Sequence, residues 1–167
     1  MMEHAFVEMI NIHRGIIYKV CNLYGLDQED KNDLFQEVVL QLWKAFPSFR
    51  QESKPSTWMY RIALNTAITN FRKTSRRPES RGISTDEFQI PDLGAYPEED
   101  EQMSLLKRAI DCLTEIEKAI ILLHLEDKTY DEISDVIGIS KSNVGVRITR
   151  IKIKLEKIIK SDRYELR

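Results

Sequence analysis

The sequence predicts an all-α protein in which two small helical domains are joined by an acidic linker. Apolar residues recur every three or four positions through most of the chain, which is the period of an amphipathic helix. No stretch alternates apolar and polar residues between hairpin turns, so a β-sheet is not expected. Residues 78–102 show neither pattern; they are rich in Asp and Glu and are interrupted by Pro and Gly, as linkers are. The chain of 167 residues has room for two small domains, which we place at 1–77 and 103–167.

Three helices are expected in the first domain. The first covers residues 4–25 and ends at Gly25, a residue type that favours helix C-termini. The second begins near Asp27, where neighbouring acids suit the positive end of the helix dipole, and runs to Pro47. The third begins near Pro55 and runs to Arg77.

The second helix carries an apolar residue on its polar side when it is projected at about 100° per residue. Its core side collects Leu34, Phe35, Val38 and Leu42. Its outward side collects Asp33, Gln36, Glu37, Leu40 and Lys44. The outward Leu40 has two interpretations, because single exposed apolar residues are common and carry no function, whereas one rimmed by polar groups can anchor a protein partner.

The third helix combines aromatic, cationic and amide side chains. Trp58 and Tyr60 lie near its start and bases lie near its end. Rings on which bases stack, together with cations that neutralise phosphate, suit a single-stranded nucleic acid. The alternative interpretation assigns Trp58, with Ile62, Ala63 and Ala67, to the core.

Local start signals predict three helices in the second domain. Thr114 and Thr129 each begin a T-x-x-E capping box. The helix after Thr129 is short and ends at Gly138, and Ser140 then caps a longer helix. Two helices joined by a tight turn that contains Gly form the helix-turn-helix layout, in which the second helix enters a DNA major groove.

The last helix separates an apolar stripe from a basic outward face. The stripe contains Val144, Ile148, Ile151, Leu155 and Ile158. The outward face and its flanks contain Ser142, Asn143, Val146, Arg147, Thr149, Arg150, Lys152, Ile153 and Lys154. Polar members can bond base edges or phosphates, and Val146 or the Thr149 methyl can touch a thymine methyl. The alternative is an ordinary amphipathic surface helix; the capping, the Gly turn and the basic face together favour DNA binding.

The formal net charge of -2 argues against a protein that coats polyanions with its whole surface, but bases are concentrated between residues 141 and 160. No apolar run approaches the roughly 20 residues that a membrane span needs. The N-terminal residues lack the layout of a signal peptide, so a cytoplasmic location without membrane insertion is expected.

No chemistry of catalysis or metal binding is indicated. Cys21 and Cys112 are far apart in sequence and are expected to be reduced, buried thiols. The three histidines show no metal-ligand spacing, and neither a Gly-rich phosphate loop nor a nucleophile elbow is present. We therefore expect no enzyme activity, no metal, no cofactor and no small-molecule substrate.

Three segments occur in a fixed order, with the acidic linker before the last: DLFQEVVLQLWKAFPSFR, STWMYRIALNTAITNFRK and LTEIEKAIILLHLEDKTYDEISDVIGISKSNVGVRITRIKIKL. Together they resemble an extracytoplasmic-function (ECF) sigma factor of bacterial RNA polymerase. The resemblance implies that residues 1–77 are sigma region 2, which binds core polymerase and melts the minus-ten element. It implies that residues 103–167 are sigma region 4, which reads the minus-thirty-five element.

The resemblance also implies site residues. The segment that docks on the clamp helices of core polymerase contributes Asp33, Gln36, Glu37 and Leu40. The minus-ten segment contributes Arg61, Asn65, Thr69, Asn70, Arg72 and Lys73, with the loop at 49–56. The minus-thirty-five helix contributes Ser142, Asn143, Val146, Arg147, Thr149 and Arg150. Many members carry Val-Arg-Ser-Arg where this chain has Val144-Gly145-Val146-Arg147, so either the remaining polar residues do the reading or the promoter differs from the family's commonest kind.

Two functions from different classes are compatible with the helix-turn-helix. One is a dissociable polymerase subunit that initiates transcription at specific promoters; the other is a free-standing regulator that binds an operator as a dimer. The outward carboxylates and the basic third helix of the first domain favour the subunit, since a regulator would use that domain for dimerisation or for a ligand. Besides core polymerase and promoter DNA, the resemblance implies a third partner. This is an anti-sigma factor that covers the polymerase-binding and DNA-binding faces.

Overall fold

The computed structural model describes residues 1–75 and 101–165 of the chain. The chain divides into two compact units, Met1–Gly94 (unit 1) and Ala95–Arg167 (unit 2). Every regular element in the described residues is a helix, which confirms the predicted all-α fold. Positions 78–100 of the predicted linker, and Arg77 at the predicted end of the third helix, lie outside the described residues.

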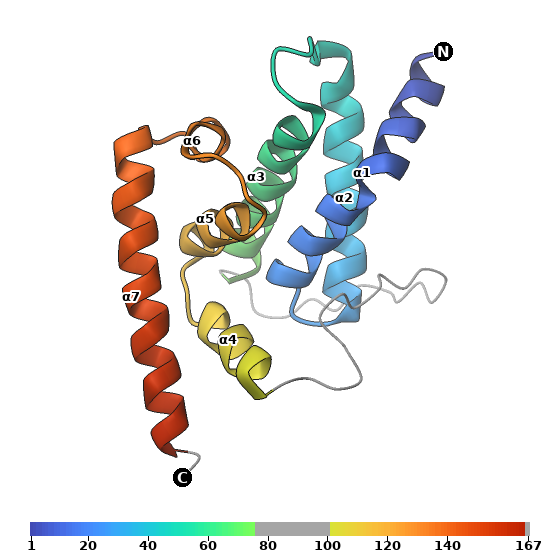
Figure 1. Cartoon of the computed structure of the whole chain (residues 1–167). Helices are drawn as coiled ribbons and strands as arrows, with labels where there is room; N and C mark the ends of the chain where they lie inside the picture. The colour runs from blue at the N-terminus through green and yellow to red at the C-terminus, as the bar shows by residue number, and fades with distance from the viewer. Residues whose placement is uncertain (76–100, 166–167) are drawn as a thin grey trace. The chain divides into compact units, whose positions relative to one another are not determined.

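Unit 1 is a bundle of three helices that run side by side (Figure 1): α1 (Met2–Tyr24), α2 (Gln28–Ala45) and α3 (Pro55–Ser75), with a 3-10 turn η1 (Phe46–Ser48) after α2. Each helix contacts the other two. The buried side chains follow the helical period on every helix and include Ile17, Val20, Val38, Leu42 and Leu64.

Aromatic rings close one end of this bundle. Phe6 of α1 packs edge-on against Trp43 and Phe46, with ring centroids 5.0 and 5.3 Å apart. Phe49, after η1, packs on Trp58 at 4.6 Å. These contacts join all three helices to the segment between α2 and α3, so the start of α3 is fixed by side chains from before it in sequence.

The turn between α1 and α2 depends on Gly25 for a reason other than the predicted one. Gly25 ends α1 as expected, but its backbone is extended, with φ -76° and ψ 133°, and is not left-handed. A Cβ there would collide with the Lys31 side chain and lie 2.8 Å from the carbonyl oxygen of Cys21. Space therefore requires glycine. Asp27 then caps α2 by accepting a 2.8 Å hydrogen bond from the backbone N–H of Asp30.

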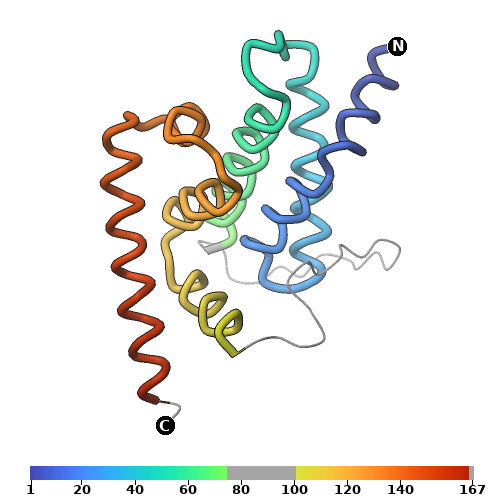
Figure 2. Tube along the Cα trace, viewed as in Figure 1, coloured from blue at the N-terminus to red at the C-terminus, as the bar shows by residue number. Residues whose placement is uncertain are grey.

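Unit 2 contains α4 (Glu101–Asp111), α5 (Glu115–Leu125), α6 (Tyr130–Ile137) and α7 (Lys141–Glu165). The long α7 runs past the other three and contacts each of them (Figure 2). The sequence analysis did not predict α4, whose first two residues fall in the expected linker. Its signal was Leu105 and Ala109, both buried and four residues apart.

Both predicted capping boxes are present. In α5 the Thr114 hydroxyl accepts a hydrogen bond from the Glu117 backbone N–H, and the Glu117 carboxylate accepts one from the Thr114 N–H; Thr129 and Glu132 do the same in α6. α6 ends at Gly138 in the left-handed conformation, with φ 81°, as predicted.

The prediction for the two cysteines is half right. Cys21 is buried in unit 1, and burial raises the pKa of its thiol to about 12. Cys112 is exposed at the end of α4, so the expectation that it is buried is wrong. Among residues 1–75 and 101–165, no helix is both long and apolar enough to cross a membrane.

Candidate functional site

The outward side of α2 forms the first candidate surface, which we call the α2 face and define by Asp33, Gln36, Glu37 and Leu40. Leu40 is 44% exposed, although Leu34, Val38 and Leu42 on the opposite side are buried. Asp33 and Gln36 are exposed and Glu37 is half-buried. The predicted projection of this helix is therefore confirmed.

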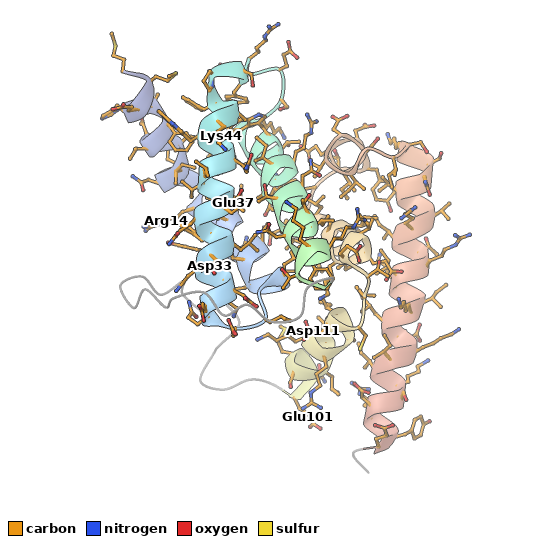
Figure 3. The ribbon with its side chains drawn as sticks, turned by 180° about the vertical axis from the view of Figure 1, so that it is seen from behind. Arg14, Asp33, Glu37, Lys44, Glu101 and Asp111 are labelled. Carbon is orange, nitrogen blue, oxygen red and sulfur yellow. The ribbon has the colours of Figure 1, made fainter. Side chains whose placement is uncertain are left out.

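Charges surround Leu40 on this face. Figure 3 shows Asp33, Glu37 and Lys44 along the side of α2 that faces the viewer, with Arg14 of α1 at its edge. The Glu37 carboxylate accepts a 2.8 Å hydrogen bond from the side-chain amide of Gln41, which holds it in place along the helix. The face thus offers one apolar side chain within a rim of mixed charge, an arrangement suited to a protein partner.

On α3, four of the six predicted minus-ten residues share one face. Arg61, Asn65, Thr69 and Arg72 recur at spacings of four, four and three; Arg61 is half-buried and the other three are exposed. Lys73 is exposed at the flank of this face, whereas Asn70 is half-buried and turned toward the core side by about 100° from Thr69.

The aromatic rings of α3 do not belong to that face. Trp58 is 9% exposed and Tyr60 is 2% exposed, and Phe71 packs against Tyr24 of α1 at 6.4 Å. The expectation that Trp58 and Tyr60 offer rings for stacking is wrong. The alternative that assigns Trp58, Ala63 and Ala67 to the core is right, whereas Ile62 is only half-buried. The core contacts of the segment before α3 explain the difference, because Phe46 and Phe49 cover Trp58.

Buried polar atoms lie at the start of the same helix. The Thr57 hydroxyl and Nε of Arg61, one turn apart, are buried and have no hydrogen-bond partner among the described residues. An unsatisfied buried donor costs on the order of 1–3 kcal/mol. The buried Nε of Arg61 lies within the bundle, so the terminal nitrogens of its guanidinium are the groups that remain for DNA.

The helix-turn-helix of unit 2 is held by local hydrogen bonds. The Ser134 hydroxyl of α6 donates to the carbonyl of Ile139 in the turn, at 2.5 Å. The Ser140 hydroxyl accepts from the backbone N–H of Asn143 at 3.2 Å, so Ser140 caps α7 as predicted. These bonds fix the direction in which α7 leaves the turn.

The outward side of α7 forms the second candidate surface, which we call the α7 face. The apolar stripe is buried at Val144, Ile148, Ile151 and Leu155, and half-buried at Ile158. The opposite side exposes Ser142, Val146, Thr149, Arg150 and Ile153, with Asn143 and Arg147 half-buried beside them. All six residues predicted for the minus-thirty-five site thus lie on the first three turns of one helix.

Only part of the predicted basic cluster is free to meet a ligand. Lys154 donates to the Glu117 carboxylate of α5 at 2.9 Å, Lys141 pairs with Asp131 at 3.2 Å and Lys160 pairs with Glu156 at 2.7 Å. Five cations of α7 form no ion pair with any described residue: Arg147, Arg150, Lys152, Lys157 and, in the last turn, Arg163.

The Lys154 pair is structural. Burial alone would raise the pKa of the Glu117 carboxyl, but hydrogen bonds from Lys154 and from the Thr114 backbone, with the positive charge of Lys154, lower the pKa overall. The same carboxylate thereby completes the α5 capping box and joins α5 to α7.

Gly145 sets the position of a residue that the sequence analysis missed. A Cβ at Gly145 would lie 3.3 Å from Cε2 of Tyr130, so the Tyr130 ring rests over this part of α7. Tyr130 remains 39% exposed. Only the tertiary structure reveals this contact, because the two residues are on different helices.

In the part of the chain that the structure describes, no three His, Cys, Asp or Glu side chains gather in a way that could hold a metal ion.

Two family models match the chain, one in each unit. Sigma-70 region 2 matches residues 9–77, and Sigma-70 region 4 matches residues 103–155. Similar curated proteins are the ECF RNA polymerase sigma-E factor of Escherichia coli strain K12, 30% identical over 148 residues with 81% of this chain and 78% of that protein covered, and its counterpart in Haemophilus influenzae, 29% identical over 165 residues with 92% and 87% covered. The RNA polymerase sigma factor HrpL of Pseudomonas syringae pv. syringae is 29% identical over 136 residues, with 78% and 74% covered.

Two solved structures share the fold. CnrH in complex with the cytosolic domain of CnrY superimposes with a TM-score of 0.68 at 19% identity, covering 96% of this chain and 90% of that one. The sigma factor RpoE in complex with the anti-sigma factor NepR, from Bartonella quintana, gives 0.69 at 20% identity, covering 95% and 98%.

Proposed function

This chain belongs to the ECF sigma factors of bacterial RNA polymerase, and from that premise we propose how its described faces divide the work of promoter recognition. As a sigma factor it binds core RNA polymerase and directs transcription initiation at specific promoters. The assignment of each step to particular residues is our proposal, and it follows the three faces described above.

The α2 face docks on core polymerase. Leu40 is the apolar anchor, and Asp33, Gln36 and Glu37 form its polar rim. A partly exposed aliphatic side chain that becomes fully covered in a complex removes apolar area from water, while the rim fixes orientation. Because the charges of this face are mixed, a protein partner fits it better than DNA does, since the DNA backbone is uniformly anionic.

The α3 face binds the minus-ten element. Arg61, Asn65, Thr69 and Arg72 lie on one side of α3, with Lys73 at its flank, and can contact phosphates and the edges of unpaired bases. Because the rings of Trp58 and Tyr60 lie in the core, recognition here relies on hydrogen bonds and charge. Asn70, turned toward the core side, supports the helix more than it reads DNA.

The α7 face reads the minus-thirty-five element. A helix that follows a tight Gly turn and is capped by Ser140 presents its first turns to the major groove. The observation that carries the proposal is that Arg147 and Arg150 stand on these turns with no ion pair to any described residue. Their charges and donors are available for guanines and phosphates.

Reconstituted transcription tests the proposal. The purified chain is added to sigma-free core polymerase from its own source, with fragments of the same genome as template. We expect discrete transcript starts that share a sequence at constant distance upstream, and none with core polymerase alone. Tight binding to duplex DNA without any initiation would instead indicate a free-standing helix-turn-helix regulator.

An anti-sigma factor is the third partner that we propose. Both solved structures described above are complexes with a second protein, and in one of them a sigma factor is bound to a partner named an anti-sigma factor. Such a partner would cover the α2 and α7 faces and so compete with polymerase. A protein captured from lysate by the immobilised chain should be displaced by excess core polymerase; retention would contradict competition.

We propose that the protein works in the cytoplasm, where core polymerase and promoter DNA are found. Its action is by binding, without catalysis, cofactor or small-molecule substrate, and polymerase supplies the chemistry of RNA synthesis.

A further inference from the structure

We propose that the α7 face reads the 5-methyl groups of thymines in the minus-thirty-five element through apolar contact with Val146 and Thr149. This inference rests on the proposed function, since it requires α7 to lie in the major groove. It adds the kind of base that this chain selects at the positions facing these two residues.

Val146 is the first observation. Its side chain is 47% exposed on the outward side of α7, whereas Val144 and Ile148, two residues before and after it in sequence, are buried on the opposite side. An isopropyl group can neither donate nor accept a hydrogen bond, so it cannot distinguish base edges by polar contacts. In the major groove the apolar group of an unmodified base pair is the thymine methyl, which makes it the favourable neighbour for such a side chain.

Thr149 is the second observation. It lies one turn after Val146, and its hydroxyl donates a 3.0 Å hydrogen bond to the carbonyl oxygen of Gly145 within the helix. The single hydroxyl proton is therefore engaged, and the hydroxyl oxygen can act toward DNA only as an acceptor. The γ-methyl is the group that exposed Thr149 can offer to DNA without breaking that bond.

Gly145 and Tyr130 extend the apolar character of this part of α7. Gly145 has no side chain to offer, and the Tyr130 ring rests over it, at 3.3 Å from where a Cβ would be. The side chains at 145, 146 and 149 thus present no free hydrogen-bond donor to the groove. Base selection at this turn therefore favours shape and apolar contact over donated hydrogen bonds.

The neighbouring charges identify DNA as the occupant of this apolar patch. Arg147 and Arg150 flank it and form no ion pair with any described residue. A protein partner would have to bury these cations, whereas DNA neutralises them with phosphate or pairs them with guanine. The combination predicts an element in which thymines stand beside positions read by arginine.

Deoxyuridine tests the proposal, because it differs from thymidine only by lacking the methyl group. The minus-thirty-five element is first selected from promoter fragments with a randomised window, using holoenzyme reconstituted from the chain and core polymerase. Each thymine of the selected element is then replaced singly by deoxyuridine. We expect a loss of affinity of about three- to tenfold at one or two positions, the size of a buried methyl contact.

Matched variants assign the effect to the two side chains. Val146→Ala and Thr149→Ser remove methyl groups and should abolish the difference between thymidine and deoxyuridine at the position each one contacts. Thr149→Val keeps the methyl without the hydroxyl and should retain the difference. Lys157→Ala should weaken binding to both forms equally, since it changes only charge near the backbone.

The possible failures are distinguishable. A selected element that lacks thymine, or that binds equally well with deoxyuridine throughout, overturns this inference and leaves the proposed function standing. If holoenzyme selects no minus-thirty-five element at all, the proposed role of α7 is wrong and this inference falls with it.

Discussion

The α2 face and the α7 face expose a similar aliphatic side chain in different electrostatic surroundings. Leu40 is 44% exposed and Val146 is 47% exposed. Leu40 stands among charged side chains of both signs: Asp33, Glu37 and Lys44 lie along the same side of α2. Val146 stands beside two arginines that have no ion pair with any described residue.

This difference teaches that exposure of an apolar residue indicates a contact surface but not its partner. The partner follows from the charges around it. A mixed rim can be matched by a protein surface, whereas arginines that form no ion pair within the chain favour the phosphate backbone.

Leu40→Asp should have the largest effect. A carboxylate in place of the apolar anchor must be buried against core polymerase, so we expect affinity to fall by about 30-fold or more, equivalent to about 2 kcal/mol. Titration of fluorescent chain with core polymerase measures this. Ile12→Asp is the matched control. Ile12 is exposed on α1, and it lies on nearly the opposite side of that helix from Arg14, which borders the α2 face. An equal loss in both variants would argue against the α2 face.

Arg150→Ala should have an effect that depends on DNA sequence. Loss of a base-reading arginine costs about 1–3 kcal/mol, or about 5- to 150-fold, and relaxes selection at its position. Lys157→Ala should weaken holoenzyme binding uniformly and lower the salt slope by about 1, as expected for one phosphate contact. Binding of holoenzyme to promoter variants at several salt concentrations checks both. Identical behaviour of the two variants would mean that the faces of α7 are wrongly assigned.

Glu117→Gln should destabilise unit 2 slightly and only above acidic pH. Gln keeps the geometry of a capping box but loses the charge that holds Lys154, so we expect a loss of about 0.5–1 kcal/mol at pH 7. The pKa of Glu117 is lowered in the folded chain, so its stabilisation is present above its ordinary pKa of 4.5 and disappears as pH falls through the lowered value. Thermal unfolding of both proteins across this range measures the difference.

Glu156→Gln provides the control for that measurement. Glu156 forms an exposed pair with Lys160 one turn away, so its loss should leave the unfolding transition almost unchanged. A difference between wild type and Glu117→Gln that persists at a pH below the lowered pKa of Glu117 would mean that the charge of Glu117 is not its cause.

Thiol labelling should distinguish the two units, because each contains one cysteine and the two cysteines differ in burial. Exposed Cys112 should react with a thiol reagent in the native chain, whereas Cys21, buried and with its pKa raised to about 12, should react only when unit 1 unfolds. Mass spectrometry of timed samples, with and without denaturant, reports each site. Rapid native labelling of Cys21 would contradict the tight core of unit 1.

The elements that could be predicted from sequence are those whose signals are local. Thr114 and Thr129 reach their capping partners three residues away, and Gly138 ends α6 through its own backbone conformation. The faces of α2 and α7 could also be predicted, because helical periodicity, which is a local signal too, decides which side chains share a side.

The errors arose where contacts are distant in sequence. Tyr60 lies in the core because other segments cover the start of α3, and Lys154 is engaged by Glu117, 37 residues earlier. The contact of Tyr130 with Gly145 likewise joins two helices. α4 was missed because its first residues continue the acidic composition of the linker, which concealed the pair Leu105 and Ala109.

Side-chain footprinting tests the central contrast most directly. Hydroxyl radicals oxidise exposed side chains, and mass spectrometry gives the oxidation rates of Leu40 and Val146 in the free chain, in the holoenzyme, and in the holoenzyme on a promoter fragment. We predict that core polymerase slows the oxidation of Leu40 and that promoter DNA then slows the oxidation of Val146. Protection of Val146 but not Leu40 by core polymerase, or an unchanged rate at Val146 on promoter DNA, would contradict the division between the two faces.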